Sequence, residues 1–212
     1  MIPRKRVISF FILLSAVFGL VAAPAARAIP SASSAQVVCE KPFYLGDERL
    51  GPRILPPSSH VVGQLLNGYD RFGDEKNHQK FLAAYWGDKG WKYPENDGFV
   101  GKPTKTVLQP GDLVDRFGGQ SGRFLAPTGT PFVQRSLPPQ SLNTCEYEPG
   151  VRMPYGYYRY KVEKEIKVVS GTTAKWFGQS GGGMQYKVES PNPPERRNVA
   201  WLVKNGYLSV VK

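Results

Sequence analysis

Glycine and proline interrupt this chain so often that long helices are excluded from most of its length. The sequence holds 23 Gly and 19 Pro in 212 residues. Proline lacks an amide donor, and glycine adopts backbone conformations that other residues avoid, so both end or bend regular structure. Neither recurs at the period of three that a collagen-like helix requires. Because 41% of the residues are hydrophobic and 12% aromatic, a packed domain of short elements is expected rather than a disordered chain.

The first 28 residues have the pattern of a secretory signal peptide. A basic start at residues 4–6 precedes an apolar run from Val7 to Ala23 and small residues at Ala26 and Ala28, the order found in cleaved signals. A membrane anchor is the alternative, but the run is short for a span and Pro24 follows it. Without the signal, 24 Lys and Arg exceed 17 Asp and Glu by 7. The mature chain is expected to be secreted and not bound to a membrane.

The two cysteines support the same compartment. Cys39 and Cys145 both lie after the signal, and a pair of cysteines in an oxidising environment most often forms one disulfide. Such a bond closes a long loop, which the entropic model values at ~4 kcal/mol. No metal site is expected, because these cysteines and the two histidines, His60 and His78, lack the spacing of zinc ligands.

The hydrophobic pattern predicts an α+β fold with a helical part before a β-rich part. Residues 29–59 are expected to form an extended arm, and 60–86 two helices that separate near Gly73. A turn-rich connector, 87–105, follows. Short β-like runs then alternate with turns: Thr106–Leu108, Leu113–Phe117, Phe132–Gln134, Tyr157–Glu163, Ile166–Val169 and Gln185–Val188. A last helix is expected over Val199–Lys204, before an edge strand over Tyr207–Val211.

The segment 115–139 combines cations and aromatic rings in a loop-rich context. It holds Arg116, Arg123 and Arg135 together with Phe117, Phe124 and Phe132. Guanidinium groups suit bidentate contacts with phosphate oxygens, and aromatic faces suit stacking on a planar ring. Taken singly, each arginine fits a surface ion pair and each phenylalanine a core position. As a cluster they favour a ligand with both features, such as a nucleotide.

A second segment, 175–187, places three glycines between two glutamines. Gly181–Gly183, with Gly182 at the centre, would let the backbone approach a ligand closely. Gln179 and Gln185 could each fix a ribose or a carboxamide by hydrogen bonds. The alternative is a flexible hairpin loop, which the spacing alone favours. The segment matches neither the phosphate-binding loop nor the dinucleotide fingerprint.

Several catalytic systems are disfavoured by what the sequence lacks. No histidine follows His78, so a Ser–His or Cys–His system would need to recruit the helical part. No pair of carboxylates is placed for ordinary glycoside hydrolysis. A site without a catalytic acid is therefore the expectation, with a lone acid as the alternative.

Two runs in this order resemble a known family: DRFGGQSGRFLAPTGTPFVQRSLPP (115–139) and YYRYKVEKEIKVVSGTTAKWFGQSGGGMQY (157–186). They are similar to the catalytic domain of tuberculosis necrotizing toxin and of fungal secreted or surface NAD glycohydrolases. The resemblance implies three parts: a signal peptide, 1–28, an arm with a thumb-like helical unit, 29–105, and a catalytic domain, 106–212. It implies hydrolysis of NAD⁺, and of NADP⁺, to nicotinamide and ADP-ribose. It also implies no metal, no cofactor and a homodimer.

The same resemblance implies roles for individual residues. By motif match, Arg116 and Phe117 are the family's Arg-Phe pair, and Arg135 its second arginine, so that the two arginines would clamp the pyrophosphate. Its essential glutamine is expected at Gln185, with Gln179 as the less favoured choice. Phe117, and Trp176 or Phe132, would pack against nicotinamide or adenine, and the backbone at Gly182 would approach the substrate. A histidine role in the bacterial branch has no counterpart, because Tyr157-Tyr158-Arg159 stands at that place.

Three alternatives to this activity stay open at the sequence level. An ADP-ribosyltransferase would also use NAD⁺, although the glutamate of that class is missing. A basic secreted toxin acting on nucleic acid would suit the net charge. Its basic residues are scattered, however, and no histidine pair is available for RNA cleavage, so no nucleic-acid partner is expected. A surface protein that keeps the fold without the activity is the third.

Overall fold

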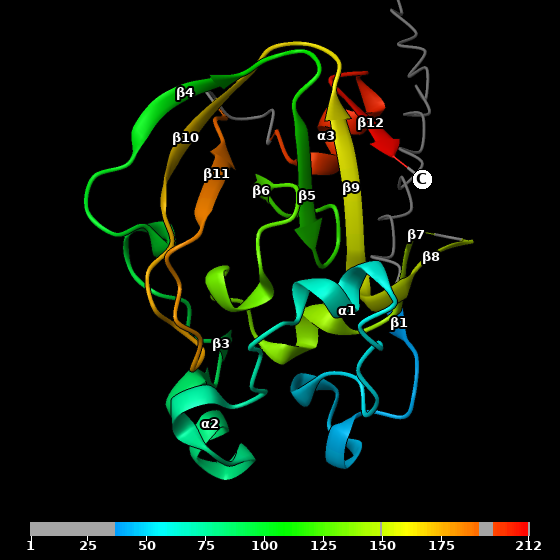
Figure 1. Ribbon diagram of the computed structural model, residues 1–212, viewed down its shortest axis with the longest axis vertical. Coiled ribbons are helices and arrows are strands. Elements are labelled where there is room, and N and C mark those ends of the chain that lie inside the picture. Colours follow the sequence, from blue (N-terminus) through cyan, green and yellow to red (C-terminus); the bar gives the residue numbers. More distant parts are fainter. Residues whose placement is uncertain (1–36, 149, 191–196, 212) are drawn as a thin grey trace, which may run out of the picture. The chain divides into compact units, whose positions relative to one another are not determined.

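Short antiparallel strands separated by turns make up the centre of the molecule. The computed structural model describes residues 37–148, 150–190 and 197–211, so the signal peptide predicted over 1–28 lies outside the described residues. Seven strands form one sheet of order β12-β9-β5-β6-β11-β10-β4 (Figure 1). Their bounds are β4 Thr104–Leu108, β5 Leu113–Phe117, β6 Phe124–Pro127, β9 Tyr157–Val162, β10 Ile166–Thr172, β11 Met184–Val188 and β12 Leu208–Val211.

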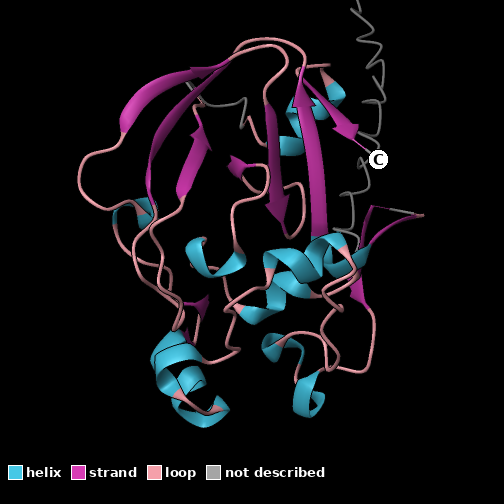
Figure 2. Ribbon diagram, in the orientation of Figure 1, coloured by secondary structure: helices cyan, strands magenta, loops and turns pink. Residues whose placement is uncertain are grey.

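Smaller elements surround this sheet, and most helical turns lie beyond one end of its strands (Figure 2). The α-helices are α1 Val61–Leu65, α2 His78–Tyr85 and α3 Val199–Lys204. A three-stranded sheet contains β1 Val38–Cys39, β7 Cys145–Glu148 and β8 Val151–Met153, and a two-stranded one contains β2 Trp86–Gly87 and β3 Gly90–Trp91. The helices of the described ranges are too short or too polar to cross a bilayer.

Local sequence explains most of these elements. In β9, Tyr158, Tyr160 and Val162 are buried whereas Lys161 is exposed, the alternation of a strand with one face in the core. Asn77 and Asn198 cap α2 and α3 by accepting hydrogen bonds from backbone amides of the first turn. The predicted disulfide between Cys39 and Cys145 is present and joins β1 to β7.

Two predictions of local structure were wrong, and one strand of the large sheet was missed. Phe132–Gln134 is a 3₁₀ helix and not a strand, because Pro131 starts a tight turn there. The arm predicted as extended contains two 3₁₀ turns, Tyr44–Gly46 and Glu48–Leu50. Strand β6 was not predicted, since its short run ends in Pro127. The split of the helical region near Gly73 is confirmed, because this glycine has a left-handed backbone with φ of 49° in a 3₁₀ turn.

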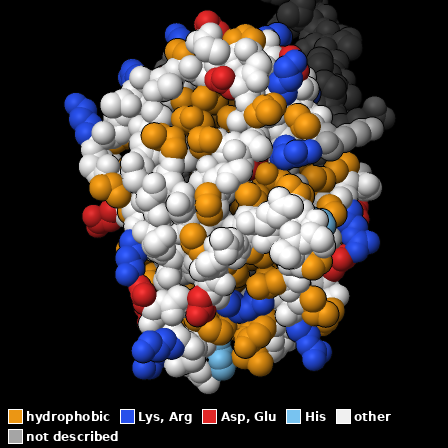
Figure 3. Space-filling model, viewed as in Figure 1, with side chains coloured by type: hydrophobic (Ala, Val, Ile, Leu, Met, Phe, Trp, Pro, Cys, Tyr) orange, Lys and Arg blue, Asp and Glu red, His pale blue; other side chains and the backbone are white. Residues whose placement is uncertain are grey.

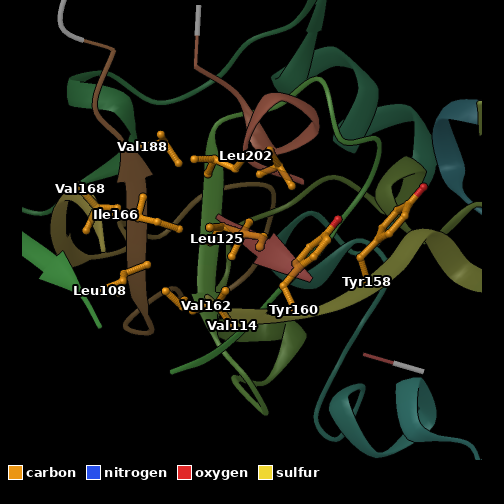
Figure 4. Packing of buried hydrophobic residues seen from close by; sticks show 12 residues of the cluster. Leu108, Val114, Leu125, Tyr158, Tyr160, Val162, Ile166, Val168, Val188 and Leu202 are labelled. Atoms are coloured by element: carbon orange, nitrogen blue, oxygen red, sulfur yellow. The ribbon is translucent and has the colours of Figure 1, made fainter. Parts of the chain in front are cut away.

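The hydrophobic core has separate clusters on the sheet and beneath its end. Figure 4 shows the largest, in which Tyr158 and Tyr160 of β9 stand side by side with parallel rings. A second cluster packs Val62 and Leu65 of α1 against Phe117 at the end of β5. Burial of each such side chain contributes about 1.5–3 kcal/mol. The N-terminal part therefore shares a core with the sheet at the point where the arginine-rich segment begins.

Candidate active site

A cavity of about 560 Å³ lies where the end of β5 meets the N-terminal segments. Four predicted site residues line it, namely Arg116, Phe117, Arg135 and Gln185. They come from β5, from the segment after the 3₁₀ helix Phe132–Gln134, and from β11. The volume falls within the roughly 300–1,000 Å³ of small-molecule sites. The two sequence segments singled out for their chemistry thus meet at one hollow.

Arg135 is held from three sides. Its Nη1 forms an ion pair of 2.6 Å with Asp115 Oδ1, and the two side chains are 5% and 0% exposed. Its Nε and Nη2 both donate to the carbonyl oxygen of Thr130, at 2.9 and 2.7 Å. The guanidinium also lies 5.1 Å from the centre of the Phe117 ring. The positive charge of Arg135 is therefore compensated before any ligand arrives.

Asp115 is the residue of this group that the sequence analysis missed. Besides Arg135, its carboxylate accepts a hydrogen bond of 2.7 Å from the Tyr157 hydroxyl and one of 3.2 Å from the amide of Gly129. Burial and this carboxylate raise the pKa of Tyr157 above its ordinary range. One sequence signal could have identified Asp115: it lies two residues before Phe117 in the predicted strand and therefore on the same face. Asp115 and Glu48 both line the cavity, but Asp115 is already paired with Arg135, and a site without a catalytic acid stays a prediction.

Arg116 is bound quite differently. Its Nη1 donates to the carbonyl of Phe124 at 3.0 Å and its Nε to that of Gly118 at 3.2 Å. No carboxylate of the described residues forms an ion pair with it. Burial lowers the pKa of the Arg116 guanidinium, the direction expected when a cation loses water without gaining an anion. An uncompensated guanidinium at a cavity wall is suited to bind an anionic ligand.

A glycine makes room for this guanidinium. A Cβ atom at Gly122 would stand 2.5 Å from Nη2 of Arg116. On the neighbouring turn, a Cβ at Gly119 would stand 2.7 Å from the ring of Tyr147, and burial raises the pKa of Tyr147. Gly122 is therefore needed for close packing against Arg116, and Gly119 for close packing against Tyr147.

The two candidate glutamines have separate surroundings. Gln185 of β11 lines the main cavity, and its Nε2 donates to the carbonyl oxygen of Asp97 at 2.9 Å. Gln179 is 3% exposed and donates to the carbonyl of Asp70 at 2.8 Å. It borders a second, smaller cavity of about 250 Å³. The structure therefore brings Gln185, and not Gln179, to the arginines.

Three further predicted substrate contacts lie outside the main cavity. Phe132 is fully buried and packs edge to face on Phe117, with ring centres 5.0 Å apart. Trp176 donates to the carbonyl of Lys92 and packs against Tyr85. Gly182 has a left-handed backbone with φ of 90°, and a Cβ there would meet no atom within 4 Å. Phe132 therefore supports the wall of the site through its contact with Phe117.

Other residues of the cavity come from segments that carried no motif. Trp91 and Tyr93 of the connector line it, and Trp91 Nε1 donates to Gln140 Oε1 at 2.6 Å. Tyr93 and Phe124 are exposed by 63% and 37% and so present aromatic surface to an incoming ligand. Periodicity offered no signal for Trp91 or Gln140, because each pairs with a residue far along the chain.

Comparisons with known proteins identify the family of this chain. The family model described as tuberculosis necrotizing toxin matches residues 107–211. The conidial surface nicotinamide adenine dinucleotide glycohydrolase of Aspergillus fumigatus is 36% identical over 176 residues, which are 78% of this chain and 70% of that protein. The solved structure of tuberculosis necrotizing toxin with its immunity factor superposes with a TM-score of 0.52 at 24% identity, over 70% of this chain and 81% of that one. The structural likeness concerns the fold.

Proposed function

The chain belongs to the tuberculosis necrotizing toxin family, and from this premise we infer that it is an NAD⁺ glycohydrolase whose active site is the cavity around Arg116. The bond cleaved joins nicotinamide to ribose, and the products are nicotinamide and ADP-ribose. The observation that carries the assignment is the uncompensated guanidinium of Arg116, in one cavity with Gln185 and exposed aromatic rings. Such a site offers partners to each part of a dinucleotide.

Arg116 is the anchor of the pyrophosphate in this proposal. A guanidinium binds phosphate oxygens through two parallel hydrogen bonds, which are stronger when no carboxylate competes. Arg135 is paired with Asp115, so it has less charge to offer. Its part is to hold Phe117 and the wall of the cavity. The symmetrical clamp expected from the sequence thereby becomes one binding arginine and one supporting arginine.

The chemistry requires little acid catalysis on the leaving group. Nicotinamide departs from a positively charged ring and becomes neutral, so the enzyme has mainly to stabilise a sugar with oxocarbenium character and to direct water to it. Gln185 would accept a hydrogen bond from the sugar or from that water. Phe117 and the exposed rings of Tyr93 and Phe124 would pack against the planar bases. Asp115 keeps Arg135 and Tyr157 in place.

The enzyme is placed outside the cytosol. The predicted signal peptide and the disulfide between Cys39 and Cys145 both indicate an oxidising compartment. The Aspergillus relative is named for the conidial surface. We therefore assign the mature chain to the secreted or cell-surface proteins.

Turnover of NADP⁺, independence of metals and other cofactors, and a homodimer are further parts of the proposal. They follow from the family resemblance and from the cationic leaving group. Nucleic acid is not a proposed substrate. Lys and Arg side chains are spread over the face in Figure 3 without a continuous basic stripe, whereas a nucleic-acid site gathers them.

The test uses the mature chain, residues 29–212, produced in an oxidising host. It is incubated with NAD⁺ and with NADP⁺ in the presence of EDTA, and nicotinamide and ADP-ribose are separated by chromatography. Gln185→Ala should lose turnover, while Gln179→Ala, the matched control, should keep it if folded. Free nicotinamide without free ADP-ribose, together with a mass increase on an added protein, would favour the transferase. A folded parent without turnover would reject the proposed function.

A further inference from the structure

A short turn before the family domain contacts the glutamine of the active site. Residues Asn96–Gly98 form a 3₁₀ turn in the connector, before the segment 107–211 that the family model matches. All three have left-handed backbone conformations, with φ of 53° at Asn96, 55° at Asp97 and 77° at Gly98. Residues with a Cβ atom rarely adopt this region. Two in succession outside glycine require support from their surroundings.

That support fixes the turn to the large sheet. The amide of Ala174 donates to the carbonyl of Gly98 at 2.8 Å, and the amide of Val100 to that of Thr172 at 2.8 Å. Phe99 is buried over Gly171, where a Cβ would stand 2.9 Å from its ring. Gly171 is the partner of Gln185 across β10 and β11. The turn is thus a rigid extension of the sheet beside Gln185.

Asp97 contacts two side chains of β11 at once. Its carbonyl oxygen accepts the 2.9 Å hydrogen bond from Gln185 Nε2, and its carboxylate pairs with Lys187 Nζ. Gln185 and Lys187 are two residues apart in β11, so they lie on the same face of the strand. The Asp97 and Lys187 side chains are 50% and 20% exposed. One residue of the connector therefore fixes both its own position and the rotamer of Gln185.

This contact sets the polarity of Gln185. A carbonyl oxygen can only accept, so the nitrogen of the amide must face Asp97. Among the described residues no donor reaches Oε1 of Gln185, which makes it the acceptor available at the cavity. An acceptor takes a hydroxyl or water donor and not a phosphate oxygen.

We propose that Asp97 is a positioning residue, which holds Gln185 by its carbonyl so that Oε1 accepts a hydrogen bond from an O–H group in the reaction. The proposal rests on the proposed function. The O–H group is either a ribose hydroxyl or the attacking water. Weaker binding of ADP-ribose to Gln185→Ala would indicate the ribose, and unchanged binding the water.

The decisive variants separate the backbone of residue 97 from its carboxylate. Asp97→Gly removes the ion pair but accepts a left-handed backbone, whereas Asp97→Val opposes that backbone and should displace the carbonyl. Glu95→Gln removes the same charge from an exposed neighbour and is the control. Because small displacements of a positioned group have large kinetic costs, kcat should fall about 10-fold in Asp97→Val, about 3-fold or less in Asp97→Gly, and not in Glu95→Gln. KM should change less than kcat.

A double-mutant cycle distinguishes positioning from a purely structural role. In the Gln185→Ala background, Asp97→Val should lower the residual kcat/KM by less than about 2-fold, because the group it positions is gone. Equal losses in both backgrounds, or equal kcat in Asp97→Val and Asp97→Gly, would overturn the proposal.

A readout independent of turnover covers the case in which the parent proves inactive. The side-chain amide resonance of Gln185, assigned from its loss in Gln185→Ala, should shift in Asp97→Val and not in Glu95→Gln. A resonance unchanged in Asp97→Val, in a protein shown folded by its thermal transition, rejects the positioning role. A shifted resonance with an inactive parent rejects the proposed function and keeps the Asp97–Gln185 contact.

Discussion

Arg135 and Arg116 belong to one motif, but a carboxylate neutralises the first and not the second. Arg135 is paired with the fully buried Asp115, while Arg116 donates to the carbonyl oxygens of Gly118 and Phe124 and has no ion pair with a carboxylate of the described residues. Both line the same cavity, and the Arg135 guanidinium lies 5.1 Å from the centre of the Phe117 ring. The two positions are separated by 19 residues in a segment where each arginine looked equivalent.

The difference teaches that proximity to a site does not make a cation available to a ligand. In a buried ion pair, the Coulomb attraction roughly offsets the cost of desolvating the two charges. The cation of such a pair is therefore already neutralised by its partner and binds a further anion weakly. A guanidinium that is hydrogen-bonded only to neutral carbonyl groups is not neutralised, so its positive charge can attract an anionic ligand. We therefore expect loss of the pair to lower mainly the stability of the protein and loss of Arg116 to lower mainly its activity on NAD⁺.

The largest effect should come from breaking the pair. Asp115→Ala leaves Arg135 as a buried, unpaired cation and removes the acceptor of the Tyr157 hydroxyl. We expect the free energy of unfolding to fall by about 3–5 kcal/mol, measured with urea. Adding Arg135→Met to Asp115→Ala should restore part of it. A loss below about 1 kcal/mol in the single variant would contradict the view that the pair stabilises the wall.

Arg116→Ala should separate activity from stability. We expect kcat/KM for NAD⁺ to fall about 100-fold, since a charge-assisted phosphate contact is lost, while the thermal transition stays or rises because an enclosed cation is removed. Arg123→Ala is the matched control. It removes the same charge, but Arg123 donates to the carbonyl of Val188 and is outside the cavity. Equal kinetic losses in both variants would point to net charge instead of a bound phosphate.

Gly122→Ala tests whether the position of Arg116 matters as well as its presence. The added Cβ would stand 2.5 Å from Nη2, so the guanidinium has to move. We expect about 10-fold lower kcat/KM with a small change in stability, because the end of a flexible side chain gives way. Ser121→Ala in the same turn should keep activity. Full activity in Gly122→Ala would show that the site tolerates a displaced guanidinium.

The smallest effect should come from an ion pair at the surface. Arg49 lowers the pKa of the Asp47 carboxyl below the ordinary value of 3.8. The carboxylate form is favoured in the folded state, so the pair stabilises above this pH and its contribution is lost as pH falls through the lowered pKa. Asp47→Asn should lower the free energy of unfolding by about 0.5–1 kcal/mol near neutral pH and by less at about pH 3. Urea unfolding at the two pH values measures both. An equal loss of stability at both pH values would show that the hydrogen bond of the Asp47 side chain, and not its charge, is responsible.

Part of the fold could be predicted because it depends on local pattern. β5, β9 and β10, the helix Val199–Lys204 and the disulfide are confirmed. Alternation of apolar residues and an asparagine cap are local signals. Phe132–Gln134 shows the limit, since a short apolar run fits a strand or a tight turn equally well. Its preceding proline decided the outcome.

The site could be predicted only as a set of motif residues. Arg116, Phe117, Arg135 and Gln185 were named from the family resemblance, and the structure places them at one cavity. Asp115 and Asp97 were not named. Asp97 acts on a residue 88 positions away, and no periodicity relates positions so far apart.

The sequence by itself determined the compartment, the α+β class and the types of side chain that line the cavity, because signal pattern, short elements and residue chemistry are properties of neighbouring residues. Only the tertiary structure decided which arginine is neutralised and which glutamine reaches the cavity. The physical reason is that charge pairing and hydrogen bonding depend on distances of about 3 Å, and register and packing set these between residues far apart in the chain. Asp115 meets Arg135, and Asp97 meets Gln185, through the fold alone.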